Sequence, residues 1–229
     1  MLSFTEFGET ATTPPLVIAH GLYGSGRNWG VIAKRLSDTR RVITPDMRNH
    51  GHSPFESTQS YEDMAHDLAE LIRHIGGPVD LCGHSMGGKL TVLTTAADSR
   101  VKAAAPSCGG VSDRTHASPL YRATLTDDQS LKRITCPIVF LSPANDFHGR
   151  IDDLQTALPE VRSPEWRVTC SAHHSHQDTA EFQVVGLLWF DQHLRGGDVM
   201  WPPLLQRMQA AAADFAALGI SPPSPLTRQ

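Results

Sequence analysis

Short apolar runs alternate with longer segments of helical spacing along most of this chain. The runs are rich in Val, Ile, Leu and Ala and indicate buried strands at Leu16–Ala19, Arg41–Thr44, Pro78–Cys82, Val101–Ala105, Pro137–Leu141 and Trp166–Cys170. Buried strands that are separated by helices build a parallel sheet with helices on each side. The pattern therefore predicts the α/β class, with a mostly parallel central sheet covered on both faces.

Helices are predicted between and after these strands. The clearest begins at Ser60, with Asp63 three residues later as in a capping box, and Gly76-Gly77-Pro78 ends it. Its apolar residues recur at helical spacing: Met64, Leu68, Leu71, Ile72 and Ile75. A second helix is expected to use Asn28 as its N-cap. The last amphipathic helix contains Phe182, Val185, Leu188 and Trp189.

The length of 229 residues fits one main domain, which we expect to span residues 1–197. Residues 111–133 form a minimal insertion in it, long enough for one short helix. Residues 198–229 are rich in Pro and Ala and are expected to form a C-terminal helix and a loose tail.

The net charge of −4, without a long block of one sign, argues against binding to nucleic acid. No apolar run is long enough to cross a bilayer, and Met1–Glu6 shows no secretory signal. The four cysteines are far apart, in or beside predicted strands, which favours core thiols over a disulfide framework. We expect a cytoplasmic protein that acts on a small molecule, and the oligomeric state stays open.

Gly83-His84-Ser85-Met86-Gly87 carries the strongest chemical signal of the chain. A predicted strand precedes it and a predicted helix follows it, which is the context of a nucleophile elbow. In such a tight turn, side chains at the flanks would collide, and glycines at 83 and 87 avoid this. Ser85 would then present its hydroxyl above the sheet, with a helix N-terminus behind it.

Two further chemical groups follow later strands in the order that a Ser-Asp-His triad needs. Asp146 follows Pro137–Leu141, with Asp152 or Asp153 as the fallback, and three histidines follow Trp166–Cys170. This order resembles the α/β-hydrolase superfamily over residues 14–196, where a serine nucleophile precedes its acid and its histidine base. His176 and His174 are equally good candidates for the base, and His173 is the third.

The same resemblance implies an oxyanion hole and a substrate-binding region. His20-Gly21-Leu22 resembles the family's oxyanion loop, so the backbone N–H groups of Leu22 and Met86 would face the developing oxyanion. His20, Gly21 and His84 are expected beside the substrate. Asp46–Ser53 resembles a polar loop of small bacterial esterases, in which Arg48 and Asn49 would be structural.

The two halves of the chain resemble different branches of the superfamily. Residues 14–95 are similar to compact bacterial esterases with a D-x-R-N-H-G-x-S loop. Residues 142–148 and 187–194 are more similar to acetyl-ester and dienelactone hydrolases, so we expect a join between Gly88 and Pro106.

Metal chemistry is the weaker interpretation of the histidines. His50, His52 and His84, or separately the histidines at 173–176, lack Cys or carboxylate partners at a recognisable spacing. We therefore expect neither a metal nor an organic cofactor.

The sequence thus favours a serine carboxylesterase that forms an acyl-enzyme, and the small insertion favours short-acyl esters. Thioesters and lactones undergo the same chemistry, and peroxide can replace water in it, so thioesterase, lactonase and perhydrolase activities stay open. The alternative from another class is a ligand-binding or single-turnover protein on the same fold.

Overall fold

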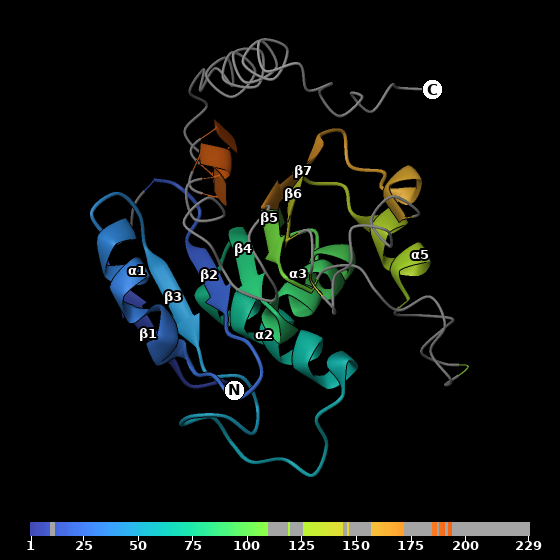
Figure 1. Ribbon diagram of the computed structural model, residues 1–229. Helices are drawn as coiled ribbons and strands as arrows, with labels where there is room; N and C mark the ends of the chain where they lie inside the picture. Colours follow the sequence, from blue (N-terminus) through green and yellow to red (C-terminus); the bar gives the residue numbers. More distant parts are fainter. Residues whose placement is uncertain are drawn as a thin grey trace, which may run out of the picture.

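The computed structural model describes residues 1–9, 12–109, 119, 126–143, 146, 157–171, 185–186, 188–190 and 192–193. Its strands form a seven-stranded sheet in the order β1-β3-β2-β4-β5-β6-β7 (Figure 1). They are β1 (Phe4–Phe7), β2 (Leu16–Ala19), β3 (Val42–Pro45), β4 (Val79–His84), β5 (Val101–Ser107), β6 (Ile138–Pro143) and β7 (Trp166–Ser171). The β1–β3 pair is antiparallel and the others are parallel. The predicted α/β class is confirmed.

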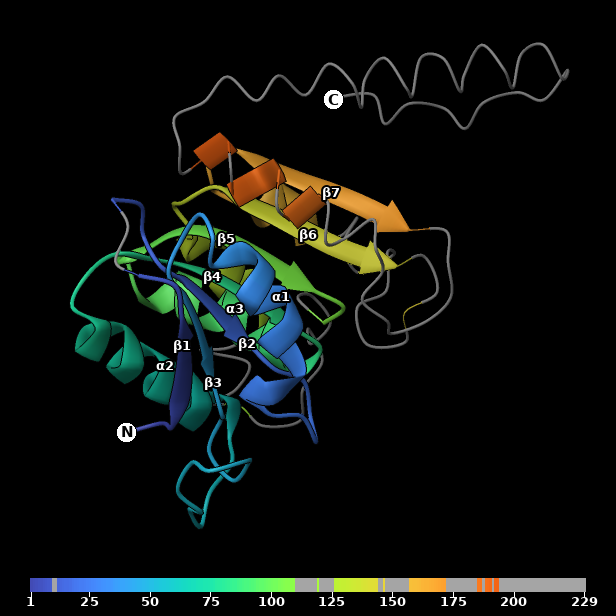
Figure 2. The ribbon, with the colours of Figure 1, turned by 90° about the vertical axis from the view of Figure 1, so that its left-hand side faces the viewer.

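Helices cover both faces of the sheet, and consecutive strand residues point to opposite faces. In β2, Val17 joins a buried cluster with α2 (Tyr61–Ile75) and α3 (Met86–Ala97), whereas Leu16 and Ile18 join a second cluster. That second cluster contains Ala33 of α1 (Gly30–Leu36) and Trp189 near the C-terminal end of the described chain. Figures 1 and 2 show α1 on the side of the sheet away from α2 and α3. Shorter helical turns are η1 (Gly26–Trp29), α5 (Asp127–Ser130), η2 (Leu131–Arg133) and η3 (Leu158–Glu160).

The predicted helix at Ser60 is confirmed in its start, its end and its buried face. The Ser60 hydroxyl oxygen accepts a hydrogen bond from the Asp63 N–H at 3.1 Å, as expected of an N-cap. Gly76 ends the helix with a φ of 87°, a left-handed conformation that glycine adopts easily. The residues buried on its inner face are Met64, Leu68, Leu71 and Ile72.

Two local predictions near the N-terminus need correction. Asn28 is not the N-cap of α1: it lies inside η1, where its Oδ1 accepts the N–H of Ser25 at 2.8 Å, and α1 begins only at Gly30. Strand β1 was not predicted from the pattern of hydrophobic positions. Its residues are half-buried or exposed, without the strict alternation that marks a strand, and pairing with β3 defines it.

The expected insertion and C-terminal tail fall largely outside the described residues. Within residues 126–133 the chain forms α5 and η2. Apart from residue 119, the remainder of the insertion lies outside the described residues, as do all of residues 198–229. Among the described helices, none is long and apolar enough to cross a membrane. Cys82, Cys108 and Cys136 form no disulfide with one another, and burial raises the pKa of Cys136 to about 11.

A buried ion pair joins the segment that precedes β3 to β4. The Arg40 guanidinium donates to a carboxylate oxygen of Asp80 in β4 at 2.5 Å and to the Pro14 carbonyl at 2.7 Å. It also lies 5.6 Å from the centre of the Phe190 ring, so the same cation contacts the C-terminal part of the domain. Burial raises the pKa of Asp80 to about 7, and the Arg40 charge opposes that rise.

Replacing Arg40 with Met is expected to destabilise the protein by about 3–5 kcal/mol near pH 8, because an uncompensated carboxylate stays buried. The pKa of Asp80 is raised relative to the unfolded chain, so the native state binds the proton more tightly. Stability from this group is therefore present at acid pH and lost as the pH rises from 4 through the folded pKa. Urea unfolding should show that Arg40→Met lowers the free energy of unfolding less at pH 5 than at pH 8. Adding Asp80→Asn to Arg40→Met should remove that pH dependence, and an equal loss at both pH values would contradict the account.

Candidate active site

Ser85 occupies the sharp turn between β4 and α3, in a backbone conformation that non-glycine residues rarely adopt. Its φ is 59° and its ψ is −119°. The neighbouring elements hold it there: its N–H donates to the Ser107 carbonyl of β5 at 2.9 Å, and its carbonyl accepts from Lys89 of α3 at 3.1 Å. A strained residue that is bound on both sides is typical of a functional site. The side chain itself is half-buried.

The flanking glycines are required by space, as the sequence predicts. A Cβ atom at Gly83 would overlap the Gly87 carbonyl, and one at Gly87 would overlap the carbonyl of Ala19 at the end of β2. Thr91 fixes this arrangement, because its hydroxyl donates to the Gly87 carbonyl at 2.8 Å. The elbow is thus packed backbone against backbone between β2 and α3.

Asp146 lies at the same edge of the sheet as Ser85. It follows the end of β6 by three residues, and β6 is separated from β4 by β5 alone. Parallel neighbouring strands end on one side, so residues that follow β4, β6 and β7 converge there. Asp146 is 2% exposed, and its N–H donates to the Pro143 carbonyl at 3.4 Å.

The candidate bases cannot be placed in the same way. His173, His174 and His176 lie outside the described residues, as do Asp152 and Asp153. The structure does show that β7 ends at Ser171, immediately before this histidine segment. The choice among the three histidines therefore stays a prediction.

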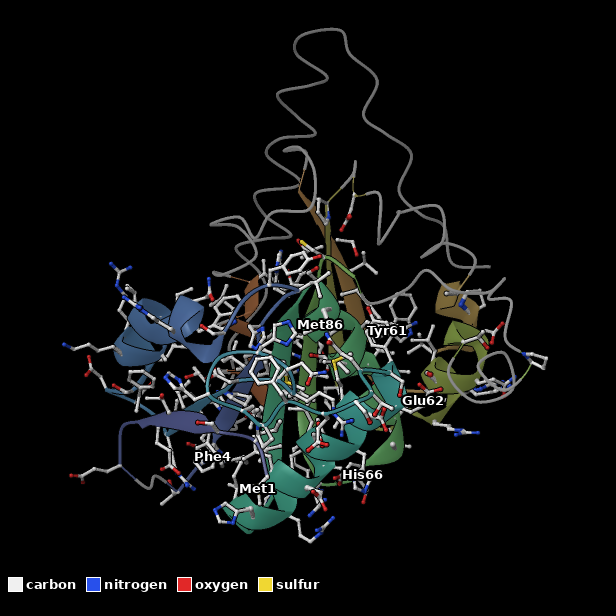
Figure 3. All side chains as sticks on the ribbon, turned by 90° about the horizontal axis from the view of Figure 1, so that it is seen from below. Met1, Phe4, Tyr61, Glu62, His66 and Met86 are labelled. Atoms are coloured by element: carbon white, nitrogen blue, oxygen red, sulfur yellow. The ribbon has the colours of Figure 1, made fainter. Side chains whose placement is uncertain are left out.

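The loop after β2 lies directly against the nucleophile. A Cβ atom at Gly21 would be 3.2 Å from the Cβ of Ser85. The Gly24 N–H donates to the Gly21 carbonyl at 3.0 Å, which closes the loop as a tight turn. Within the described part of the chain, no hydrogen bond engages the N–H of Leu22 or of Met86. Met86 is the first residue of α3, where helix N–H groups lack intrahelical partners, and Figure 3 shows it near the middle of the molecule.

His20 is buried behind this loop and is bonded to backbone through both ring nitrogens. Its Nδ1 lies 2.8 Å from the Gly21 carbonyl oxygen, and its Nε2 accepts the Met47 N–H at 2.9 Å. Burial lowers the pKa of His20. Of the three residues expected beside the substrate, Gly21 and His84 are adjacent to Ser85, with His84 Nδ1 3.4 Å from a Cβ placed at Gly21. His20 instead contacts the loop backbone.

The segment Asp46–Ser53 fixes the start of η1, next to the oxyanion loop. Asp46 accepts hydrogen bonds from the N–H of Gly26 at 2.7 Å and of His52 at 2.8 Å. Burial acts to raise the pKa of Asp46, but the hydrogen bonds from His52 and Gly26 outweigh it, and the pKa is lowered. Arg48 donates to both carboxylate oxygens of Asp67, at 2.6 and 2.8 Å, and so ties the segment to α2.

The histidines that suggest a metal site do not assemble one in the described part of the chain. His50 Nδ1 bonds to the Arg48 carbonyl at 2.8 Å, and His52 lies beside Asp46. The described group with ligand atoms close enough for an ion is His66, Asp67 and Glu70 on α2, which the sequence analysis did not identify. Figure 3 labels His66 on this helix. Arg48 already occupies both oxygens of Asp67, so this cluster is explained without an ion.

Comparison with known proteins agrees with this geometry. The sequence model described as "Alpha/beta hydrolase family" matches residues 16–226. The chain is 45% identical over 95 residues to the mouse sn-1-specific diacylglycerol lipase ABHD11, covering 40% of this chain and 31% of that protein. It is 42% identical over 85 residues to Esterase YbfF of Escherichia coli, covering 36% of this chain and 33% of the esterase. The chain thus matches about a third of the length of these relatives.

The structural similarity covers far more of the chain than these two pairwise sequence matches do. A solved structure of a marine microorganism esterase superposes with a TM-score of 0.66 at 25% identity. The superposition covers 82% of this chain and 98% of that one. This chain and that esterase therefore share their fold over most of both chains.

Proposed function

The chain belongs to the α/β hydrolase family, and we propose that it is a serine hydrolase that cleaves short-acyl carboxylic esters through an acyl-enzyme. Esterase and lipase relatives support a hydrolase. The observation that carries the serine mechanism is the conformation of Ser85. Its strained backbone is held by β5 and α3 at the carboxyl edge of the sheet. Among the described residues, none bonds to the nearby N–H groups of Leu22 and Met86.

The chemistry follows from this arrangement. Ser85 Oγ attacks the ester carbonyl carbon while a histidine after β7 takes the hydroxyl proton. The carbonyl oxygen becomes an oxyanion, which accepts hydrogen bonds from the N–H groups of Leu22 and Met86. Collapse of this intermediate breaks the bond to the alcohol, which leaves with the histidine proton. Water then repeats the sequence on the acyl-serine and releases the acid.

Asp146 is proposed to orient the histidine and to stabilise its cation. Its burial and its place after β6 suit a carboxylate that meets a base from the adjacent strand β7.

Among the histidines, His176 and His174 are the leading candidates for the base. Replacing the true base with Ala should lower kcat by about 10⁴-fold or more, whereas the other two variants should stay near wild type.

A preference for short acyl groups is expected because residues 108–137 connect β5 to β6 without room for a large cap. The test is hydrolysis of p-nitrophenyl acetate, butyrate and octanoate by the wild type and the three histidine variants. We expect kcat/KM to be higher for acetate and butyrate than for octanoate. A higher value for octanoate would contradict the acyl preference, and an absence of turnover on all three would contradict the esterase.

A further inference from the structure

The outer side of η1 and α1 carries positive charge without counter-charges. Ala33 of α1 is buried against the sheet, whereas Lys34 and Arg35 of the same helix and Arg27 of η1 are exposed. Between residues 12 and 37 the chain has these three cations and no Asp or Glu, although its net charge is −4. In the described part of the chain, none of the three forms an ion pair. This side of the molecule is therefore suited to attract an anionic partner.

Exposed apolar side chains accompany these cations. Leu22 is 52% exposed, Tyr23 is 93% exposed and Val31 is 67% exposed. Val31 follows Arg27 and lies one helical turn before Arg35, so its side chain is placed among the cations. Single exposed apolar residues are ordinary on a protein surface, but a group of them beside unpaired cations marks an interaction surface. Figure 2 faces this side of α1.

Tyr23 is held in a backbone conformation that a large side chain adopts only at a cost. The Gly24 N–H donates to the Gly21 carbonyl at 3.0 Å, so Tyr23 is the third residue of a β-turn. Its φ is 61°, a value at which glycine or asparagine is usual. The chain nevertheless presents an aromatic ring to solvent here, in the loop that contacts Ser85. Strain that is kept at such a place points to a binding role.

We propose that this side of the molecule is a docking surface for an anionic lipid bilayer, which we call the basic face. Its residues are Leu22, Tyr23, Arg27, Val31, Lys34 and Arg35. The cations bind lipid phosphates, and the apolar side chains enter the boundary between headgroups and acyl chains. Such a face lies on a bilayer and does not cross it. Docking would turn the loop beside the nucleophile toward the lipid, and the binding itself does not require catalysis.

The composition of the basic face favours a bilayer over other anionic partners. A nucleic acid is bound mainly through phosphate contacts, which leave the exposed Leu22 and Val31 unexplained. A stable protein partner buries about 800 Å² on each side around an apolar core, which needs more than three apolar side chains. A bilayer needs less, because each cation near its surface strengthens binding about fivefold and tyrosine is favoured at headgroup level.

Cosedimentation with vesicles tests the proposal directly. The protein used is Ser85→Ala, so hydrolysis of lipid esters cannot alter the vesicles and the result does not depend on the proposed function. We expect binding to vesicles of phosphatidylcholine mixed equally with phosphatidylglycerol and no binding to phosphatidylcholine alone. Added salt should weaken the binding, because it screens exposed charges. Equal binding to both kinds of vesicle, or binding to neither, would overturn the proposal.

A matched pair of charge reversals tests whether the basic face is the site. Arg27→Glu combined with Lys34→Glu should weaken binding by about 25-fold or more, since two cations are lost. Lys132→Glu combined with Arg133→Glu changes the net charge equally, at exposed residues of η2. Figure 1 shows α5, which η2 follows, on the other side of the molecule from α1. This control should bind like its parent, and thermal unfolding should be similar for both. Equal losses of binding would exclude the basic face.

Tyr23→Gly tests the apolar contribution. We expect weaker vesicle binding, by about tenfold, together with a higher midpoint of urea unfolding, because glycine relieves the strained turn. A purely structural role for Tyr23 would instead lower that midpoint. Phe55→Ser is the control, because Phe55 is 81% exposed, lies in another loop and is followed by Glu56. If Tyr23→Gly binds as tightly as its parent, or if Phe55→Ser loses as much, the proposal is wrong.

The same variants would reveal a different occupant. A single-stranded oligonucleotide that binds the protein more tightly than the mixed vesicles do would identify a nucleic acid. A dimer that forms without lipid, and that the Arg27→Glu and Lys34→Glu substitutions separate, would identify a second copy of this chain. Either result would overturn the assignment of the basic face to lipid.

Discussion

Ser85→Ala is expected to lower kcat for ester hydrolysis by about four to six orders of magnitude. Alanine keeps the Cβ atom and removes the hydroxyl that attacks the carbonyl, so the loss should appear in kcat while the fold is retained. Rates are to be measured on p-nitrophenyl butyrate with the wild type and the variant prepared in parallel.

The conformation of Ser85 supplies a matched control for this result. With a φ of 59° and a ψ of −119°, residue 85 is in a region that suits glycine alone. Ser85→Gly should therefore be as inactive as Ser85→Ala, yet more stable than it by about 1–3 kcal/mol, the cost of such backbone strain. Urea unfolding measures the difference. Equal stability of the two variants would mean that the turn stores no strain, and retained activity in both would exclude Ser85 as the nucleophile.

Gly87→Ala is expected to destabilise the protein by about 3 kcal/mol or more, at the upper end of what overpacking costs. The added Cβ would overlap the carbonyl oxygen of Ala19 and approach that of His20 to 2.8 Å, and neither backbone atom can move without shifting β2. Activity should fall as well, because the same movement displaces the oxyanion loop from Ser85.

Gly30→Ala is the control for this change. A Cβ at Gly30 meets nothing within 4 Å, and the residue is the first of α1. Alanine favours a helix over glycine, so this variant should be unchanged or more stable by up to about 1 kcal/mol. Thermal unfolding and the rate of ester hydrolysis are to be measured for Gly87→Ala and Gly30→Ala. Similar effects of the two substitutions would contradict the packing that we assign to the elbow.

The sequence was sufficient to predict features whose cause is local. The elbow depends on Gly83 and Gly87 beside Ser85, and the helix at Ser60 depends on its cap and on the spacing of Met64 and Leu68. Both are confirmed. The order of strands also predicted that Asp146 follows β6 at the edge of the sheet where Ser85 lies, because parallel strands end on one side. Its catalytic role stays a prediction.

Features whose cause is distant in the chain could not be predicted in this way. Arg40 pairs with Asp80 across 40 residues, and His20 bonds to Met47 across 27 residues, so neither partner is visible in local spacing. The edge strand β1 is defined by pairing with β3. Asn28 was misassigned because a residue that suits an N-cap also suits the third position of a short turn.

The expected join between two branches of the superfamily stays a prediction. Sequence matches to ABHD11 and YbfF cover 40% and 36% of the chain, while the esterase superposition covers 82%. The sequence similarity is thus strong over a part of the chain, and the fold is shared over 82% of it. Neither comparison locates a join.

The central claim is that Ser85 is a nucleophile activated by its place in the fold. Its most direct test is to treat the wild type with a fluorophosphonate, which forms a stable bond to an activated serine, and to locate the adduct by peptide mass spectrometry. The account predicts one adduct, on Ser85, with complete loss of ester hydrolysis and with no labelling of Ser85→Ala. Labelling of another residue, or an unlabelled wild type that still hydrolyses esters, would contradict it.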